Sequence, residues 1–282
     1  MGTYAVTGSR SGMGQGVVER LRAADHHVIT VDLADADVVA DLATPEGRQQ
    51  AAYDVLGICN GRLDGAVLAA GIGPNPGRDQ ARLICQINYH GVVDLLAAWR
   101  PALATTGSSK VVAFASNSTT TTPVVPGRAI RALLAGDAET AVRVLRRYRG
   151  AAPAMAYAAS KTALSRWVRR EAVTRAWAGS GIRLNALAPG AVMTPLLERQ
   201  LSTPGQARLI RSFPVPVGGY GDAGQLADWV LFMLSPAADF LCGSVVFVDG
   251  GSDAYLRPDA WPRTVPVRQL LGYLRRMRSF RP

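Results

Sequence analysis

The chain contains little cysteine, almost no lysine and no long hydrophobic run. Its 282 residues include three cysteines, Cys59, Cys85 and Cys242, which are far apart and show no metal-ligand spacing. We therefore expect neither a disulfide framework nor a metal site. No apolar stretch approaches the ~18 residues of a membrane span. The N-terminus leads directly into a strand-like segment without a basic, cleavable leader, which favours a cytoplasmic protein.

The composition excludes several classes of protein. Apolar residues make up 48% of the chain and charged residues 18%, with 29 glycines and 17 prolines. Such a mixture is not that of a disordered, collagen-like or coiled-coil chain. The length fits one large α/β domain or two small ones, with enough residues to bury a full core.

The net charge of +10 is carried by arginine and is concentrated at the C-terminus. Only Lys110 and Lys161 are lysines among the 31 basic residues. The segment from Ala254 to Pro282 holds seven arginines and one aspartate, a net charge of +6, which leaves +4 for the rest. A basic balance alone is a weak sign of nucleic-acid binding, so we expect no nucleic-acid partner.

Apolar strand-like segments alternate with helical stretches along most of the chain. This pattern predicts βαβ units, and therefore a Rossmann-type, doubly wound parallel sheet with helices on both faces. The predicted strands cover residues 3–7, 27–32, 38–41, 63–70, 111–116, 182–188 and 244–249, and the predicted helices include about 12–24, 45–59 and 80–104.

Two segments interrupt this alternation, and a third extends it. Residues 126–150 resemble one or two basic amphipathic helices, and residues 196–216 a mobile helical flap. In the tail, Val267, Leu270, Leu271 and Leu274 have the i, i+3, i+4, i+7 spacing of a short amphipathic helix. We expect a single domain over 1–258, which contains the insertion and the flap, and a basic extension over 259–282.

A glycine-rich turn joins the first predicted strand to the first helix, Thr7-Gly8-Ser9-Arg10-Ser11-Gly12-Met13-Gly14. Its glycines let the backbone approach a pyrophosphate, and the helix N-terminus offers free N–H groups. Asp32 ends the second strand, 18 positions after Gly14. A carboxylate there accepts hydrogen bonds from ribose hydroxyls and repels a 2′-phosphate, which favours NAD over NADP.

Arg10 opposes this choice, since a cation in the loop could pair with a 2′-phosphate. It would have to bypass Asp32, so we still expect NAD. Asp41 ends the third strand and is either an adenine contact or a strand-end cap. We expect the cofactor to be bound by Gly8, Arg10, Ser11, Gly12, Met13, Gly14, Asp32, Leu33, Asp41, Leu42, Ala70, Gly71, Lys161, Pro189, Gly190, Val192 and Thr194.

Tyr157 and Lys161 are four residues apart on a predicted helix, and therefore on one face. A nearby ammonium stabilises a phenolate, so we expect Lys161 to lower the pKa of Tyr157 from about 10. The phenol could then exchange a proton near neutral pH. The alternative is a buried tyrosine beside a surface lysine.

Three further positions complete the candidate site. Ser116 ends the fifth predicted strand, at the sheet edge where ligands of open α/β sheets bind, and its hydroxyl could hold a reacting oxygen. Asn88 could hold a water that links Lys161 to solvent. The turn Pro189-Gly190 and the Thr194 hydroxyl suit a carboxamide, although each could be an ordinary structural residue.

Over about residues 3–257 the sequence resembles the short-chain dehydrogenase/reductase family. The resemblance rests on Thr7-Gly8…Gly12…Gly14, Asp32, Asp64, Asn88, Ser116, Tyr157…Lys161 and Pro189-Gly190. The segments 35–42, 68–74, 117–156 and 249–258 are most similar to the NAD-dependent 3α-hydroxysteroid dehydrogenase/carbonyl reductase group and its coniferyl alcohol dehydrogenase relatives. Most members have asparagines where this chain has Leu68 and Ala69.

The resemblance implies a role for each candidate residue. Tyr157 would be the general acid/base, and Lys161 would lower its pKa and bind the nicotinamide ribose. Ser116 would orient the substrate oxygen, and Asn88 would support a proton relay. It also implies that the 126–150 insertion packs in a subunit interface.

We therefore expect an NAD(H)-dependent oxidoreductase that interconverts a secondary alcohol and a ketone on a small apolar substrate. The alternatives are a coniferyl-type aryl alcohol dehydrogenase and a non-catalytic dinucleotide-binding protein. The flap residues Leu196, Leu197, Leu201, Leu209, Ile210 and Phe213 would cover the substrate or simply pack in the core. We expect a homodimer or homotetramer and no membrane partner. The tail would dock on a neighbouring subunit or stay partly disordered, with attachment to an acidic membrane or partner as the alternative.

Overall fold

Seven parallel strands form one sheet in the order β3-β2-β1-β4-β5-β6-β9, which confirms the predicted Rossmann-type fold. The computed structural model describes residues 1–260, 262 and 264–279, without the side chains at 196, 199, 200, 204, 206 and 209. The strands are β1 (Thr3–Thr7), β2 (His27–Asp32), β3 (Val38–Val39), β4 (Gly65–Leu68), β5 (Lys110–Phe114), β6 (Arg183–Pro189) and β9 (Val245–Val248).

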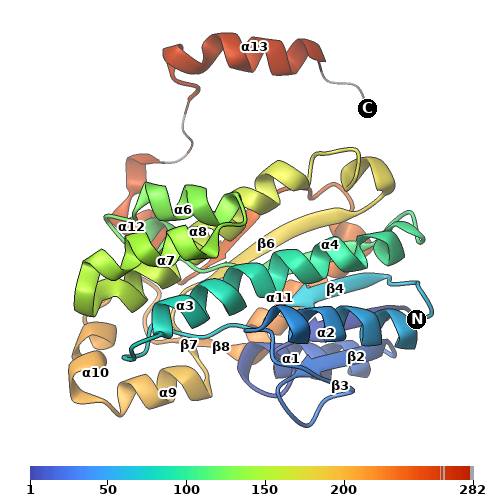
Figure 1. Cartoon of the computed structure of the whole chain (residues 1–282), viewed down its shortest axis with the longest axis horizontal. Helices are drawn as coiled ribbons and strands as arrows, with labels where there is room; N and C mark the ends of the chain where they lie inside the picture. Colours follow the sequence, from blue (N-terminus) through green and yellow to red (C-terminus); the bar gives the residue numbers. More distant parts are fainter. Residues whose placement is uncertain (261, 263, 280–282) are drawn as a thin grey trace.

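Helices cover both faces of this sheet (Figure 1). Because strand side chains alternate, Val111 and Ala113 of β5 lie in one core while Val112 and Phe114 lie in the other. One core is closed by α1 (Gly12–Ala23) and α11 (Ala223–Leu234). The other is closed by α2 (Pro45–Ile58), α3 (Gln80–Cys85), α4 (Gly91–Ala104) and α8 (Ala152–Glu171).

The helix expected over 80–104 is divided. A π-helical turn, Gln86–His90, separates α3 from α4. Such turns change the direction of side chains within a helix and are frequent at functional sites. Asn88 lies in this turn and is fully buried.

The 126–150 insertion folds onto its own chain. It forms α6 (Gly127–Leu134), α7 (Ala138–Leu145) and the 3-10 turn η2 (Arg146–Ala151). The apolar sides of α6 and α7, which include Ile130, Leu133, Val142 and Leu145, are buried in the core shared with α8. Its proposed place in a subunit interface stays a prediction.

The flap consists of two short helices, α9 (Pro195–Leu201) and α10 (Pro204–Arg211). It is bounded by a small parallel pair that the sequence did not predict, β7 (Val192–Met193) and β8 (Gly221–Asp222). The remaining helices are α5 (Ser118–Thr121), α12 (Ser252–Leu256), the short turns η3 (Ala178–Ser180), η4 (Pro236–Ala238), η5 (Pro258–Ala260) and η6 (Val267–Gln269), and α13 (Leu270–Ser279). In Figure 1, α13 lies apart from the sheet and its helices.

Candidate active site

The glycine-rich turn has the conformation that a dinucleotide phosphate requires. Gly8 and Gly12 have φ of +67° and +57°, a region that other residues rarely adopt. A Cβ on Gly14 would lie 2.0 Å from the Gly8 carbonyl oxygen, so only glycine permits this packing. Ser11 directly precedes α1 and does not cap it through its side chain, and no acidic residue lies in the first turn. The N-terminus of α1 is thus a site for an anion.

Asp32 is held rigidly at the end of β2. Its Oδ2 accepts a hydrogen bond from the Arg10 backbone N–H (2.9 Å), and its Oδ1 accepts one from the Leu33 N–H (2.7 Å). The Arg10 guanidinium pairs with Asp35 at 2.9 Å. The Asp32 carboxylate is therefore fixed beside the phosphate loop, and the competing cation pairs with a different carboxylate.

A cavity of about 300 Å³ joins these features. Its wall includes most of the predicted cofactor contacts, namely Gly8, Ser11, Gly12, Met13, Gly14, Asp32, Leu33, Asp41, Leu42, Ala70, Gly71 and Thr194. Other wall residues were not predicted from the sequence, among them Val31, Ile72, Asn75 and Ile87. These are apolar or loop residues without a motif, so only the fold could reveal them. The cavity, the helix N-terminus and the carboxylate together fit a nicotinamide dinucleotide.

Five predicted contacts do not line this cavity. Arg10 pairs at the surface, and Lys161 lies deeper in the protein. Pro189 and Gly190 tie strand ends together, because the Pro189 carbonyl accepts the Asn117 N–H (2.9 Å) and the Gly190 N–H bonds to Val248 (3.1 Å). Val192 is buried in the β7–β8 pair. Asp41 lines the cavity, and its Oδ1 also accepts a hydrogen bond from the Ala43 backbone N–H (2.9 Å). It therefore has features of both expected roles, cavity contact and strand-end cap.

Tyr157, Lys161 and Ser116 meet where β5 ends against α8. Tyr157 and Lys161 are one turn apart on α8, and the Tyr157 phenol forms a hydrogen bond with Ser116. The Ser116 Oγ also accepts the Ser118 N–H (3.1 Å), which orients the hydroxyl. The Lys161 Nζ donates to the Phe114 carbonyl oxygen at 2.6 Å. The predicted acid/base, its hydroxyl partner and the ammonium are thus brought together.

Burial changes the proton affinities of this group. It lowers the pKa of Lys161 to about 8, because an ammonium is poorly solvated there. Burial also raises the pKa of Tyr157, and the hydrogen bond from Ser116 only partly opposes the rise. The expected lowering by Lys161 is thus absent from this structure, in which the net shift of the phenol is upward. The physical reason is that the buried phenol loses water while the ammonium is directed to Phe114.

Asn88 holds the loop that follows β4. Its Oδ1 accepts the Ile72 N–H (2.9 Å), and its Nδ2 donates to the Ile72 carbonyl (3.0 Å). Gly71, the neighbour of Ile72, lies beside both Asn88 and Lys161, since a Cβ there would be 3.3 Å from Asn88 Oδ1 and 3.6 Å from Lys161 Nζ. Both polar groups of the Asn88 amide therefore position the cavity wall, and the proton relay stays a prediction.

One polar residue near the site was not predicted from the sequence. The Ser118 Oγ is buried without a hydrogen-bond partner among the described residues, two positions after Ser116. An unsatisfied buried hydroxyl is costly, and such groups often await a ligand or water. The run of serine and threonine at 116–122 gave no signal that separated this hydroxyl from its neighbours.

The flap contributes apolar side chains of which only part is described. Leu197 is buried, and Leu201, Ile210 and Phe213 are half-buried. The predicted Leu196 and Leu209 side chains lie outside the described residues. Thr194, at the start of the flap, lies over the phosphate loop, because its Cγ2 would be 3.3 Å from a Cβ on Gly12.

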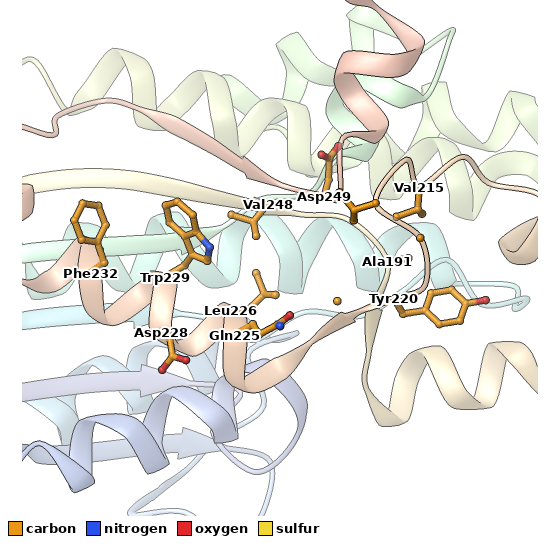
Figure 2. A pocket seen from close by; sticks show the side chains of 14 residues that line it. Ala191, Val215, Tyr220, Gln225, Leu226, Asp228, Trp229, Phe232, Val248 and Asp249 are labelled. Carbon is orange, nitrogen blue, oxygen red and sulfur yellow. The ribbon is translucent and has the colours of Figure 1, made fainter.

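A larger hollow lies away from these residues. It has a volume of about 830 Å³ and is lined by α11, by the segment 215–221, and by the end of β9 with the two residues that follow it. Figure 2 shows Trp229 and Phe232 along α11, with Val248 of β9 and Val215 beyond them. None of Ser116, Tyr157 and Lys161 lines it. This hollow is therefore separate from the candidate active site.

A cavity at a glycine-rich turn, close to a half-buried tyrosine and a buried serine and lysine, is typical of Rossmann-fold oxidoreductases that use nicotinamide cofactors. A family profile described as enoyl-(acyl carrier protein) reductase matches residues 140–253. The 3-alpha-hydroxysteroid dehydrogenase/carbonyl reductase of Comamonas testosteroni is 36% identical over 261 residues, which cover 92% of this chain and 99% of that protein. The chain belongs to the short-chain dehydrogenase/reductase family of oxidoreductases.

Solved structures agree with this assignment. The NADH complex of the 3-alpha-hydroxysteroid dehydrogenase from Pseudomonas sp. B-0831 superposes with a TM-score of 0.83 at 39% identity, over 91% of this chain and 99% of that one. A putative NAD(P)-dependent gluconate 5-dehydrogenase from Beutenbergia cavernae, with bound NADP, has a TM-score of 0.69 at 26% identity, over 89% and 96% of the two chains. The fold thus accommodates either nicotinamide dinucleotide.

The depressed pKa of Lys161 predicts that this lysine destabilises the fold. Below about pH 8 the folded protein buries a charge that unfolding returns to water. We expect Lys161→Met to raise the free energy of unfolding near pH 7 by on the order of 2–3 kcal/mol. The gain should fade between pH 8 and 10.5, where the folded wild-type lysine is already neutral.

Urea unfolding of both proteins at pH 7 and pH 9.5 measures this difference. Lys110→Met is the matched control, because Lys110 is equally buried but pairs with Asp239 at 2.7 Å, and it should give no such gain. Equal effects of Lys161→Met at the two pH values would contradict the prediction.

Proposed function

We propose that the protein is an NAD(H)-dependent oxidoreductase that interconverts a secondary alcohol and a ketone on an apolar substrate. The observation that carries this proposal is that the Tyr157 phenol and the Ser116 hydroxyl approach each other near the buried Lys161, whose Nζ is held by the Phe114 carbonyl oxygen (2.6 Å). The similarity to the Comamonas testosteroni enzyme supports a substrate of the 3α-hydroxysteroid or carbonyl type.

The proposed roles follow from the geometry. Tyr157 exchanges a proton with the substrate oxygen, which Ser116 orients by a second hydrogen bond. Lys161, fixed on the Phe114 carbonyl, places its ammonium at the cavity wall beside Gly71. When bound, the nicotinamide ring supplies or accepts the hydride. Cofactor and substrate held together on one rigid wall gain rate through proximity and orientation.

The preference for NAD rests on Asp32. Its two oxygens are held at the cavity by the backbone N–H groups of Arg10 and Leu33. A ribose hydroxyl can donate to such a carboxylate, whereas a 2′-phosphate placed there would be repelled. The bound NADH of the Pseudomonas relative supports the same choice.

A panel of alcohols tests the proposed reaction and the substrate class together. Purified protein is incubated with NAD⁺ or NADP⁺ and a 3α-hydroxysteroid, a coniferyl-type alcohol or a simple secondary alcohol, and reduced nicotinamide is followed by absorbance. We expect NAD⁺-dependent turnover to be fastest with the hydroxysteroid. Fastest turnover of the coniferyl-type alcohol would show that the substrate is an aryl alcohol and not a hydroxysteroid. NADH binding without any turnover would indicate a non-catalytic dinucleotide-binding protein.

Removal of the Tyr157 hydroxyl should abolish proton transfer. General acid–base catalysis contributes about 10²–10⁴-fold, so we expect Tyr157→Phe to lower kcat by at least a hundredfold. NADH affinity, measured by fluorescence titration, should not change, since Tyr157 does not line the cofactor cavity. Tyr53→Phe, on the exposed side of α2, is the matched control. Turnover at the wild-type rate in Tyr157→Phe would disprove the mechanism.

Neutralising Asp32 should change the choice of cofactor. Asp32→Asn keeps the shape and one hydrogen-bond acceptor but removes the charge that repels a 2′-phosphate. We expect the ratio of kcat/KM for NAD⁺ over NADP⁺ to fall about tenfold or more, which corresponds to 1–2 kcal/mol of electrostatic discrimination. Asp54→Asn on α2 makes the same change of net charge away from the cavity and should leave the ratio unchanged. An unchanged ratio in Asp32→Asn would exclude Asp32 as the determinant.

We further propose that the protein assembles into homo-oligomers through the face that carries the larger hollow. Trp229 and Phe232 on α11 are 44% and 48% exposed, and Phe240 before β9 is fully exposed. β9 also lies at the edge of the sheet. Exposed aromatic patches beside an edge strand are typical of association surfaces.

The double substitution Trp229→Lys with Phe232→Lys should convert the assembly to monomers, because it places charge in an apolar interface. Sedimentation at several protein concentrations measures the mass. Tyr53→Lys, a similarly exposed aromatic on α2, should leave the mass unchanged. A wild-type chain that stays monomeric, or a double variant that assembles normally, would contradict the proposed interface.

A further inference from the structure

The helix α13 is set apart from the rest of the chain. Among the described residues, the only element with which it packs extensively is the adjoining turn η6. Figure 1 shows it above the sheet and its covering helices. The sequence between α12 and α13 contains Pro258, Pro262 and Pro266, which disfavour a continuous helix from the body into the tail.

One side of this segment is apolar and open to solvent. Val267, Leu270, Leu271 and Leu274 follow the i, i+3, i+4, i+7 spacing, and Met277 continues the stripe one turn later. Val267 is 87% exposed, Leu271 81% and Met277 62%. These side chains cover no part of the described core, so the stripe needs another surface.

The other side is strongly basic. Arg268 and Arg275 are seven residues apart and share a face, and Arg276 adjoins them. Arg278 is four residues after Leu274 and therefore lies at the C-terminal end of the apolar side. No aspartate or glutamate occurs in the sequence after Asp259. The segment thus joins a narrow apolar stripe to uncompensated positive charge.

A helix of this kind is not stable by itself. α13 has ten residues, and isolated helices shorter than ~12–15 residues are marginal in water. The structure therefore implies a surface that accepts the leucine stripe and compensates the arginines. A helix with leucines on one face and arginines on the other is the form that lies in the interface of an anionic bilayer.

We infer that α13 binds the surface of an anionic lipid bilayer, with the leucine stripe inserted among the acyl chains and the arginines among the headgroups. A second copy of this chain is a poorer acceptor, because outside its own tail it carries a net charge of +4, which does not compensate the arginines. A nucleic acid would compensate the charge but would leave the leucine stripe in water. The aliphatic part of an arginine side chain can lie along the apolar stripe while its guanidinium group stays among the headgroups.

The inference goes beyond the proposed oxidoreductase activity and does not depend on it. No helix among the described residues is long and apolar enough to cross a membrane, so the attachment would be peripheral and reversible. This attachment would hold the enzyme at the lipid bilayer, in which an apolar alcohol or ketone dissolves.

Co-sedimentation with vesicles tests the inference on the full-length protein. Vesicles of phosphatidylcholine with about 30% phosphatidylglycerol are compared with vesicles of phosphatidylcholine alone, at low salt and at 0.5 M NaCl. We expect binding only to the anionic vesicles, and loss of that binding in high salt because the charges are screened.

Two double variants separate the contributions of the two faces. Leu271→Ser with Leu274→Ser should abolish binding, and Arg275→Gln with Arg276→Gln should lower the partition coefficient by on the order of 25-fold, about fivefold for each arginine. Gln269→Ser on the same segment is the control and should bind like the wild type. Unchanged NADH affinity shows that each variant is folded, and this readout does not require turnover.

Three results would overturn the inference. The first is the absence of wild-type protein from the anionic vesicle pellet. The second is equal pelleting of the wild type and the Leu271→Ser, Leu274→Ser variant. The third is loss of oligomeric mass in that variant without any vesicle binding by the wild type, which would show that the tail docks on a second copy.

Discussion

The site depends on one buried ammonium group. Lys161 is 5% exposed, and its Nζ reaches the carbonyl oxygen of Phe114, the last residue of β5, at 2.6 Å. This contact joins α8 to the end of the central strand, and it fixes where Tyr157 meets Ser116. Arginine could not replace it, because a guanidinium is too large and too rigid for a single carbonyl in this space.

The second lysine, Lys110, also occupies a buried site with a single oxygen acceptor. In a sequence with 31 basic residues, the only two lysines are Lys110 and Lys161. Lys110 is the first residue of β5, and Lys161 bonds to the last. Both are buried, and each has one oxygen acceptor. A compact ammonium fits such places, whereas the arginines occupy exposed positions in most of the molecule.

The sheet could be predicted from the sequence, because buried parallel strands between helical segments leave a strong apolar pattern. Most of the cavity wall could also be predicted, since the glycine-rich turn and Asp32 have fixed places in such a fold. It could not show that Pro189 and Gly190 tie β5, β6 and β9 together, because a Pro-Gly turn has the same letters in either role. The sequence also could not show how far the Tyr157 phenol is removed from water. This burial raises the pKa of Tyr157, whereas a lowering was expected.

The small pair β7 and β8 and the interruption at 86–90 were missed for a related reason. Both arise from tertiary packing rather than from local preference. A two-residue strand has no period that a sequence can display. The π-helical turn inserts one residue into an otherwise regular apolar helix, and it is stabilised by the place it gives Asn88 beside Ile72.

The cofactor preference shows how a fixed charge prevails over a mobile one. Arg10 and Asp35 form an exposed ion pair, which contributes at most about 1 kcal/mol, so the guanidinium is free to leave it. Asp32 is different, since two backbone N–H groups hold its carboxylate in place whatever the arginine does. A 2′-phosphate would gain a flexible cation but would still meet this carboxylate at the cavity wall. The electrostatic penalty therefore persists, and this favours NAD for the proposed reaction.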